Sequence, residues 1–243
     1  MKSLRSPDRS PAGCYVGVVT ARPYDVVTFD CYGTLIDWEA GITGAFARAA
    51  ARDGIDLDPA ALLDAYLGTE RVVEGETYRP YRDILVETAR RVTASLRWPL
   101  ESVRGRFLPD SLGDWPPFPD TNPALQRLAG AGYRLGILSN VDDDLLAASR
   151  RHLMVPFEII VTAEHVRSYK PAPGHWHEAR RRIGDARWLH AAQSYYHDVA
   201  AARSLGVPVA WINRKGNAIG SAGPPDRMFG NLTELGDWLA PSA

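Results

Sequence analysis

The sequence predicts an α/β protein: a mostly parallel sheet of about five strands, covered by helices on both faces and interrupted by a helical insertion. Two observations lead to this prediction. From residue 24 onward, short runs of β-branched and apolar residues alternate with segments of helical periodicity, which is the pattern of βαβ units. Between residues 38 and 117 the alternation stops and only helical segments appear, which indicates an insertion after the first strand.

The predicted strands begin with Val26–Phe29, a β-branched and apolar run that ends at Asp30 and is broken by Gly33. Four later runs of similar composition lie at residues 133–138, 158–161, 188–192 and 209–212. Because helical segments separate these runs, we expect the strands to lie parallel to one another.

The predicted helices between the strands occupy residues 122–130, 142–152, 174–183 and 198–205. Inside the insertion, helical segments lie at residues 42–51, 59–67 and 83–96, and a proline-rich stretch at 115–119 marks its end. We therefore divide the chain into a disordered leader at residues 1–22, a core at 23–37 and 118–243, and a helical insertion at 38–117.

The composition is that of an ordinary globular protein, with 243 residues of which 45% are hydrophobic and 23% charged. The formal net charge of −1 offers no surplus of positive charge to a phosphate backbone, so we expect no nucleic-acid partner. No run approaches the roughly 18 apolar residues of a membrane-spanning helix, so we expect no membrane partner. Two cysteines, Cys14 and Cys31, are too few for a disulfide framework and predict free thiols in a cytoplasmic protein.

Polar side chains follow four of the predicted strands, at the edge where ligands bind in open parallel sheets. Two carboxylates, several hydroxyls and one ammonium are expected to meet there, a set that suits nucleophilic catalysis with a paired cation. These side chains are Asp30 and Thr34 after the first strand, Ser139 and Asn140 after the second, Lys170 after the third, and Ser194, His197 and Asp198 after the fourth.

Four segments around these residues resemble the motifs of the haloacid dehalogenase-like hydrolase superfamily. They are VVTFDCYGTLIDWE at 26–39, LGILSN at 135–140, YKP at 169–171 and QSYYHDVAAA at 193–202. The resemblance covers about residues 24 to 240. It implies a Rossmann-like core, a helical cap formed by residues 38–117, and an aspartate nucleophile at Asp30.

Within this superfamily, two positions favour the 2-haloacid dehalogenase branch over the phosphatases. Phosphatases of this superfamily usually carry a second aspartate two residues after the nucleophile, which protonates the leaving group. This chain has Tyr32 at that position, and a phenol is a poor proton donor. In the fourth motif Asp198 is the single acid, which is few ligands for magnesium. We therefore expect metal-free hydrolysis of a small 2-haloacid, without a cofactor.

Three other functions stay open beside this one. The first is a magnesium-dependent phosphatase acting on a small phosphate ester, and the second is a hydrolase of another carbon–heteroatom bond. The third is a non-catalytic binding protein, which the set of Asp30, Lys170 and Asp198 argues against. In each case we expect a small-molecule ligand, and a homodimer is compatible with the sequence.

The resemblance also implies a role for each core residue of the site. Asp30 would attack the carbon that bears the halogen and form an ester, which water then hydrolyses. Lys170 would keep Asp30 ionised, lower its pKa and contact Asp198. Thr34 and Ser139 would orient Asp30 or the substrate carboxylate.

The resemblance further implies a halide site at Asn140 together with an arginine from the cap, a role that suits a guanidinium because it offers several donors and a permanent charge. Arg71 is our first choice for this arginine and Arg79 the second, with Arg82 a further candidate. Two aromatic residues complete the predicted substrate-binding set: Tyr32, which would shape the pocket, and Trp176, which stands where the family has a tyrosine. Gln193 and Tyr195 depart from the family pattern and leave the exact substrate open.

Overall fold

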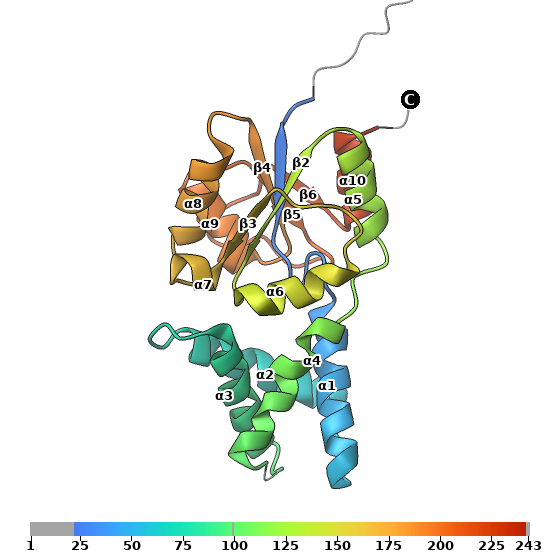
Figure 1. The fold of residues 1–243 in the computed structure, drawn as a ribbon, viewed down its shortest axis with the longest axis vertical. Helices are drawn as coiled ribbons and strands as arrows, with labels where there is room; N and C mark the ends of the chain where they lie inside the picture. Colours follow the sequence, from blue (N-terminus) through green and yellow to red (C-terminus); the bar gives the residue numbers. More distant parts are fainter. Residues whose placement is uncertain (1–21, 99, 242–243) are drawn as a thin grey trace, which may run out of the picture.

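The computed structural model describes residues 22–98 and 100–241. It contains a six-stranded parallel sheet covered by helices, joined to a separate group of helices below it (Figure 1). This arrangement confirms the α/β fold predicted from the alternation of strands and helices. The predicted leader lies, apart from Arg22, outside the described residues.

The sheet has the strand order β3-β2-β1-β4-β5-β6, with all neighbours parallel. The strands are β1 (Val26–Phe29), β2 (Arg134–Ser139), β3 (Ile159–Thr162), β4 (Trp188–Ala192), β5 (Val209–Ile212) and β6 (Arg227–Phe229). In register, Phe29 of β1 lies between Ile137 of β2 and Ala191 of β4, and these three strands end within two residues of one another. The sixth strand was not predicted, because β6 has three residues and two of them are exposed.

Successive residues of β1 face opposite sides of the sheet, as the two-residue period of a strand requires. Val27 and Phe29 pack in the hydrophobic cluster that includes residues of α5 (Thr121–Gly130) and α10 (Leu232–Leu239). Val26 packs in a second cluster with residues of α8 (Gly174–Ile183) and α9 (Ala200–Ser204). Figure 1 shows these two pairs of helices on opposite faces of the sheet. Both faces are therefore buried, which explains the continuous apolar runs in the sequence.

Two further short helices complete the core, α6 (Asp143–Ser149) and α7 (Ala163–Val166). The predicted helix at 142–152 is divided into α6 and a 3₁₀ turn, η3 (Arg150–His152). The predicted helix at 198–205 begins earlier than expected, with a π-helical turn, η4 (Tyr195–Val199), ahead of α9. This π-helical turn carries Asp198.

The insertion consists of helices and connecting segments within the described part of residues 38–114. Its helices are α1 (Trp38–Asp53), α2 (Pro59–Glu74), α3 (Tyr81–Ser95), η1 (Ser102–Arg106), α4 (Phe107–Ser111) and η2 (Leu112–Asp114). Helix α1 begins where the Asp37 carboxylate accepts the Ala40 N–H at 3.1 Å, and it ends at Gly54, which has a left-handed φ of 68°.

The two chain segments that join the core to the insertion lie side by side. Ile36 forms an isolated antiparallel bridge with Pro117, and the Asp37 N–H donates to the Pro116 carbonyl at 2.8 Å. A hydrophobic cluster continues from Phe29 in the sheet to Phe46 in α1. The boundaries 37/38 and 117/118 remain our proposal for the limits of the cap.

None of the helices in the described residues is long and apolar enough to cross a membrane.

Candidate active site

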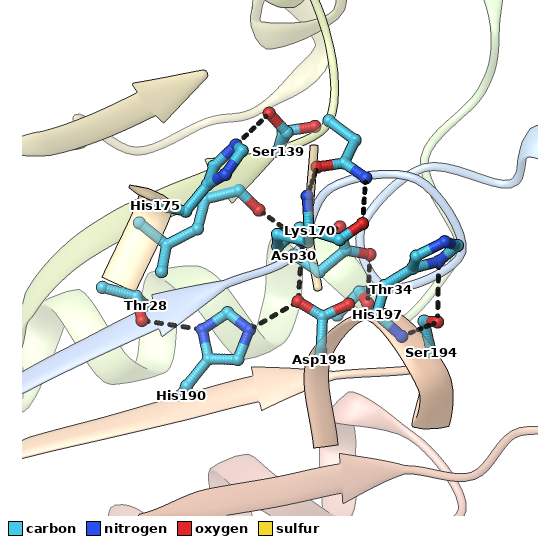
Figure 2. Close-up of polar contacts among 12 residues, drawn as sticks. Thr28, Asp30, Thr34, Ser139, Lys170, His175, His190, Ser194, His197 and Asp198 are labelled. Atoms are coloured by element: carbon cyan, nitrogen blue, oxygen red, sulfur yellow. Dashed lines mark hydrogen bonds and ion pairs between the residues drawn. The ribbon is translucent and has the colours of Figure 1, made fainter. Parts of the chain in front are cut away.

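The candidate active site lies at the carboxyl ends of β1, β2 and β4, where the sequence predicted it. Asp30 follows β1 directly, Ser139 is the last residue of β2, and Asp198 lies in η4 after β4. Lys170 comes from the segment between α7 and α8. Because the three strands end at the same edge of the sheet, side chains that are far apart in the sequence meet in a small volume (Figure 2).

The Lys170 ammonium is the centre of this cluster. Its Nζ donates to Asp30 Oδ1 at 2.9 Å, to Asp198 Oδ1 at 2.6 Å and to the Leu138 carbonyl at 2.9 Å. The lysine is only 2% exposed, and these three acceptors match its three N–H groups. A buried charge is tolerated only when it is paired in this way.

The two carboxylates of the cluster differ in pKa. Burial raises the pKa of Asp198, but the Lys170 ammonium and the hydrogen bond from His190 outweigh burial and hold that pKa well below its usual range. For Asp30, burial is the largest influence, and with the negative charge of Asp198 it raises the pKa above the ordinary value. The Lys170 charge lowers the pKa of Asp30, as predicted, but burial has the larger effect, so the pKa of Asp30 is raised on balance.

A chain of hydrogen bonds behind Asp198 orients its carboxylate. Trp188 Nε1 donates to Thr28 Oγ1 at 2.7 Å, and Thr28 Oγ1 lies 2.8 Å from His190 Nδ1. Since Thr28 already accepts from Trp188, we assign its own proton to the bond with His190 Nδ1. Burial lowers the pKa of His190 and keeps the ring neutral, so Nε2 carries the proton and donates to Asp198 Oδ1 at 3.0 Å (Figure 2).

Asp30 is also held from the opposite side. Thr34 Oγ1 donates to Asp30 Oδ2 at 3.0 Å and accepts the Gln193 N–H at 2.9 Å. Each carboxylate oxygen of Asp30 thus has a donor, Lys170 for Oδ1 and Thr34 for Oδ2. The side chain has little freedom to turn away from the ligand space above it.

A cavity of about 220 Å³ opens above Asp30 between the core and the insertion. Its floor comes from the core and its opposite wall from α1, α2 and α3. The lining residues are Asp30, Tyr32, Ser139, Asn140, Lys170, Gln193, Ser194, His197 and Asp198 from the core, and Trp38, Ile42, Tyr66, Leu67, Glu70, Glu74, Tyr81 and Trp115 from the insertion and its exit.

Ser139 and Asn140 both line this cavity, but they differ in how their side chains are hydrogen-bonded. Ser139 Oγ is buried and has no hydrogen-bond partner among the described residues. The Asn140 amide is fully engaged: its Oδ1 accepts the Lys170 N–H at 2.6 Å, and its Nδ2 donates to the Lys170 carbonyl at 3.0 Å and to Glu74 at 2.8 Å. In this arrangement Asn140 has no hydrogen left for a halide, contrary to the expected role.

The arginines expected in the halide site lie elsewhere, which corrects the sequence prediction. The exposed Arg71 guanidinium stacks 5.0 Å from the ring centre of Tyr196, and Arg79 pairs with Glu76 at 3.0 Å. Arg82 pairs with Asp144 at 2.5 Å. None of the three arginines lines the cavity. Each has found an aromatic or acidic partner on the surface, which helical spacing alone could not reveal.

The two predicted aromatic residues also differ in position. Tyr32 lines the cavity, and its hydroxyl lies 2.9 Å from Ser149 Oγ. Trp176 is 2% exposed and packs in the core, with its ring centre 4.8 Å from that of His190. The predicted substrate contact of Trp176 is therefore wrong, because α8 buries this side chain beneath the sheet.

Sequence reasoning missed the acidic residues that the insertion brings to the cavity. Glu70 accepts hydrogen bonds from the hydroxyls of Tyr66 and Tyr81, and Glu74 lies 3.5 Å from His197 Nε2. Tyr66, Glu70 and Glu74 are spaced four residues apart, so they share one face of α2. Carboxylates on the otherwise apolar face of a helix were the available signal.

His197 couples this wall to the core. Burial opposes its charged form, but Glu74 raises the pKa of His197 above its ordinary value. Ser194 Oγ lies 3.1 Å from His197 Nδ1 (Figure 2).

Within the described ranges, no three histidine, cysteine or acidic side chains gather in a way that could hold a metal ion.

The fold and the site together define a hydrolase class. Residues 24–206 match the haloacid dehalogenase-like hydrolase family, and the chain belongs to that family. Curated relatives include the (S)-2-haloacid dehalogenase of Pseudomonas putida, 26% identical over 89% of this chain and 96% of the relative. The (S)-2-haloacid dehalogenase 4A of Burkholderia cepacia is 28% identical over 84% of this chain and 87% of the relative.

Solved structures agree with this assignment. A defluorinating L-2-haloacid dehalogenase is 25% identical and superimposes with a TM-score of 0.77 over 89% of this chain and 95% of its own. The L-2-haloacid dehalogenase of Xanthobacter autotrophicus with chloropropionic acid covalently bound has a TM-score of 0.75 and 18% identity, over 90% of this chain and 100% of its own. The second likeness shows the shared fold.

Proposed function

We propose that this protein hydrolyses the carbon–halogen bond of a small 2-haloacid through an ester intermediate on Asp30. One observation carries the proposal: a carboxylate held by Lys170 and Thr34 faces the cavity, with a tyrosine at the position of the phosphatase acid. The Tyr32 hydroxyl is within hydrogen-bonding distance of Ser149, and burial raises its pKa well above the ordinary value. A halide leaves without a proton, so this site suits it.

The proposed reaction has two steps. In the first, an Asp30 oxygen donates an electron pair to C2 of the substrate, and the halogen leaves with the bonding pair as halide. In the second, water adds to the Asp30 carbonyl carbon, the ester C–O bond at that carbon breaks, and the 2-hydroxyacid departs. The sum is haloacid plus water giving hydroxyacid, halide and one proton, which passes to solvent.

The residues around Asp30 have separate tasks in this scheme. Lys170 and Thr34 hold the carboxylate in one orientation, and the raised pKa of Asp30 makes its anion more basic and a stronger nucleophile. Ser139 Oγ, buried without a partner at the cavity, is the donor that we assign to the substrate carboxylate. Burial of the site strengthens each of these electrostatic interactions.

The proposed reaction needs no metal ion. The Lys170 ammonium lies between Asp30 and Asp198 and supplies the positive charge that a divalent cation would bring to that pair. We propose that residues 38–117 act as a cap that shields the ester from bulk water. Cytoplasmic location and homodimer formation stay predictions; gel filtration with light scattering would test the second.

A single-turnover experiment in ¹⁸O-labelled water tests the mechanism. With excess enzyme and each enantiomer of 2-chloropropionate, we expect the label in Asp30 and the unlabelled oxygen in the first product. Asp30→Asn should lose nearly all halide release, while Asp64→Asn, an exposed change on α2, should keep it.

Two results would count against this function. Label that appears directly in the first product would show attack by water on carbon, without an ester on Asp30. Phosphate-ester hydrolysis that EDTA abolishes, together with no halide release, would identify a magnesium-dependent phosphatase instead.

A further inference from the structure

The wall of the cavity opposite Asp30 is aromatic and acidic. We call this surface the cap wall and define it by the residues Trp38, Tyr66, Glu70, Tyr81 and Trp115. The Trp38 and Tyr66 rings pack with centres 6.0 Å apart, so helices α1 and α2 present their aromatic faces together. Only one of these five residues is charged, and its charge is negative.

The Glu70 carboxylate is fixed by two tyrosines that use only one of its oxygens. Tyr81 donates its hydroxyl to Glu70 Oε1 at 2.6 Å, and Tyr66 donates to the same oxygen at 3.1 Å. In the described part of the chain, Glu70 Oε2 accepts no hydrogen bond. One oxygen of an immobilised carboxylate is thus available to a ligand in the cavity.

Glu70 also lacks a positive partner, unlike the other acids of the cavity. Lys170 pairs with both Asp30 and Asp198, and the positive form of His197 pairs with Glu74. Among the described residues, no lysine, arginine or histidine forms an ion pair with Glu70. Burial and the nearby Glu74 charge raise the pKa of Glu70, and they outweigh the hydrogen bonds from Tyr81 and Tyr66 and the charge of His197, which lies beyond ion-pair distance. A cation at Oε2 would therefore stabilise the ionised form of Glu70.

The floor of the cavity, unlike the cap wall, is suited to an anionic group of the ligand. Ser139 Oγ is fully buried and has no partner among the described residues, so it can donate to an acceptor such as a carboxylate. A ligand that satisfies both surfaces has an anionic group at Ser139 and a cationic group at Glu70. Aromatic faces beside a carboxylate are a recurring way to bind an ammonium group.

We propose that the cap wall is a subsite for an ammonium group, with Glu70 as its specificity-determining residue. The substrate is then a 2-haloacid with a protonated or quaternary amine at the far end of its chain. This inference rests on the proposed function, because it places the halogen-bearing carbon at Asp30. It is also consistent with the lining of the cavity, to which the described residues contribute no arginine that would occupy the position of the cation.

The test uses matched pairs of 2-chloroacids that differ in a terminal trimethylammonium group, with two to four methylene groups in the chain. We expect kcat/KM to be roughly tenfold higher for the ammonium member of the best pair. Glu70→Gln should reduce that ratio to near one, since an amide keeps the tyrosine contacts but loses the charge. The control Glu76→Gln, an exposed residue that pairs with Arg79, should keep the ratio.

Binding of the hydroxyacid products separates this inference from the proposed function. Calorimetry with the corresponding 2-hydroxyacids needs no chemistry, and the ammonium product should bind roughly tenfold more tightly to the wild type but not to Glu70→Gln. Equal binding of both products to the wild type, or a preference that Glu70→Gln retains, would overturn the subsite. If no chloroacid releases halide but the binding preference is present, the proposed reaction fails and the ammonium subsite stands.

Discussion

At the scale of single residues, the site is governed by one buried lysine shared between two carboxylates. Asp30 and Asp198 are close enough to repel each other, and the Lys170 ammonium makes their proximity tolerable. The same lysine donates to the Leu138 carbonyl, which anchors it to the end of β2. The catalytic arrangement and the stability of this edge of the sheet therefore depend on the same side chain.

Replacing Lys170 with methionine should damage both properties. The change leaves two buried carboxylates without a cation, which should cost about 3–5 kcal/mol of unfolding free energy. Halide release should fall by roughly a hundredfold or more, because the Asp30 anion loses its partner. Urea unfolding and steady-state kinetics measure the two effects. Lys215→Met, at an exposed residue paired with Glu39, is the control, and a similar loss there would contradict the assignment.

The raised pKa of Asp30 predicts where activity is lost in acid. The nucleophile is the ionised form, so kcat/KM falls as pH decreases through this pKa. Since burial raises the pKa, the fall should occur above the pH of about 3.9 at which an ordinary aspartate titrates. A pH profile with 2-chloropropionate measures it. The profile of Glu70→Gln should keep the same fall; a fall at or below the ordinary value in the wild type would count against the burial argument.

At the scale of elements, the junction between α3 and the core is the most informative contact. Pro80 stands before α3 and cannot cap it with a side-chain hydrogen bond. Asp142 of the core takes this role: its two carboxylate oxygens accept the Tyr81 and Arg82 N–H groups, each at 2.8 Å. The negative charge of the carboxylate also interacts favourably with the positive end of the dipole of helix α3. Thus a core residue completes a cap helix and holds Tyr81 at the cavity.

Asp142→Ala should therefore loosen the cap. We expect a loss of about 1 kcal/mol of stability, as for other capping residues, together with a raised KM. Hydrogen exchange of the Tyr81 and Arg82 amides should become faster. The matched control is Asp58→Ala, which removes the cap of α2 within the insertion and should cost similar stability without changing KM. Unchanged KM and unchanged exchange in Asp142→Ala would show that this contact does not hold the cap.

Helix α2 is an element whose C-terminal boundary the sequence pattern did not predict. The predicted helical segment covered residues 59–67 and stopped just before Gly68, a residue that is a poor helix former in a helix interior. The helix continues to Glu74, since Tyr66 and Val73 are buried on either side of the glycine and their packing outweighs its cost. That extension brings Glu70 and Glu74 to the cavity, so an error in one boundary removed two site residues from the prediction.

At the scale of the whole molecule, core and insertion share one hydrophobic cluster. It runs from Phe29 and Ile137 in the sheet through Ile36 and Trp115 at the junction to Phe46 in α1. The two connecting segments are also hydrogen-bonded to each other, as in the bond from the Asp37 N–H to Pro116. The insertion is thus packed against the core as well as tethered to it.

This continuity predicts that the protein unfolds in one cooperative transition. Calorimetry should give a single peak whose calorimetric and van't Hoff enthalpies agree. Circular dichroism and tryptophan fluorescence should report the same midpoint, because Trp98 lies in the insertion and Trp188 in the sheet. Two peaks would mean that the shared cluster does not couple the two parts.

The sequence by itself determined the class of the fold and the centre of the site. Periodicity identified five of the six strands and the helical insertion, since each signal is carried by neighbouring residues. Asp30, Ser139, Lys170 and Asp198 could be expected together, because the carboxyl ends of parallel strands meet at one edge. Thr34 was expected with them as a polar residue after the first strand, and its orienting role came from the family resemblance.

Only the tertiary structure decided what faces Asp30 across the cavity. Arg71 and Arg79 had the right chemistry for an anion site, but their orientation depends on partners such as Tyr196 and Glu76. Glu70 gained its place through Tyr66 and Tyr81, and the Tyr81 contact joins two helices. The physical reason is that a helix pattern shows which residues share a face, whereas docking against other elements decides which face meets the ligand.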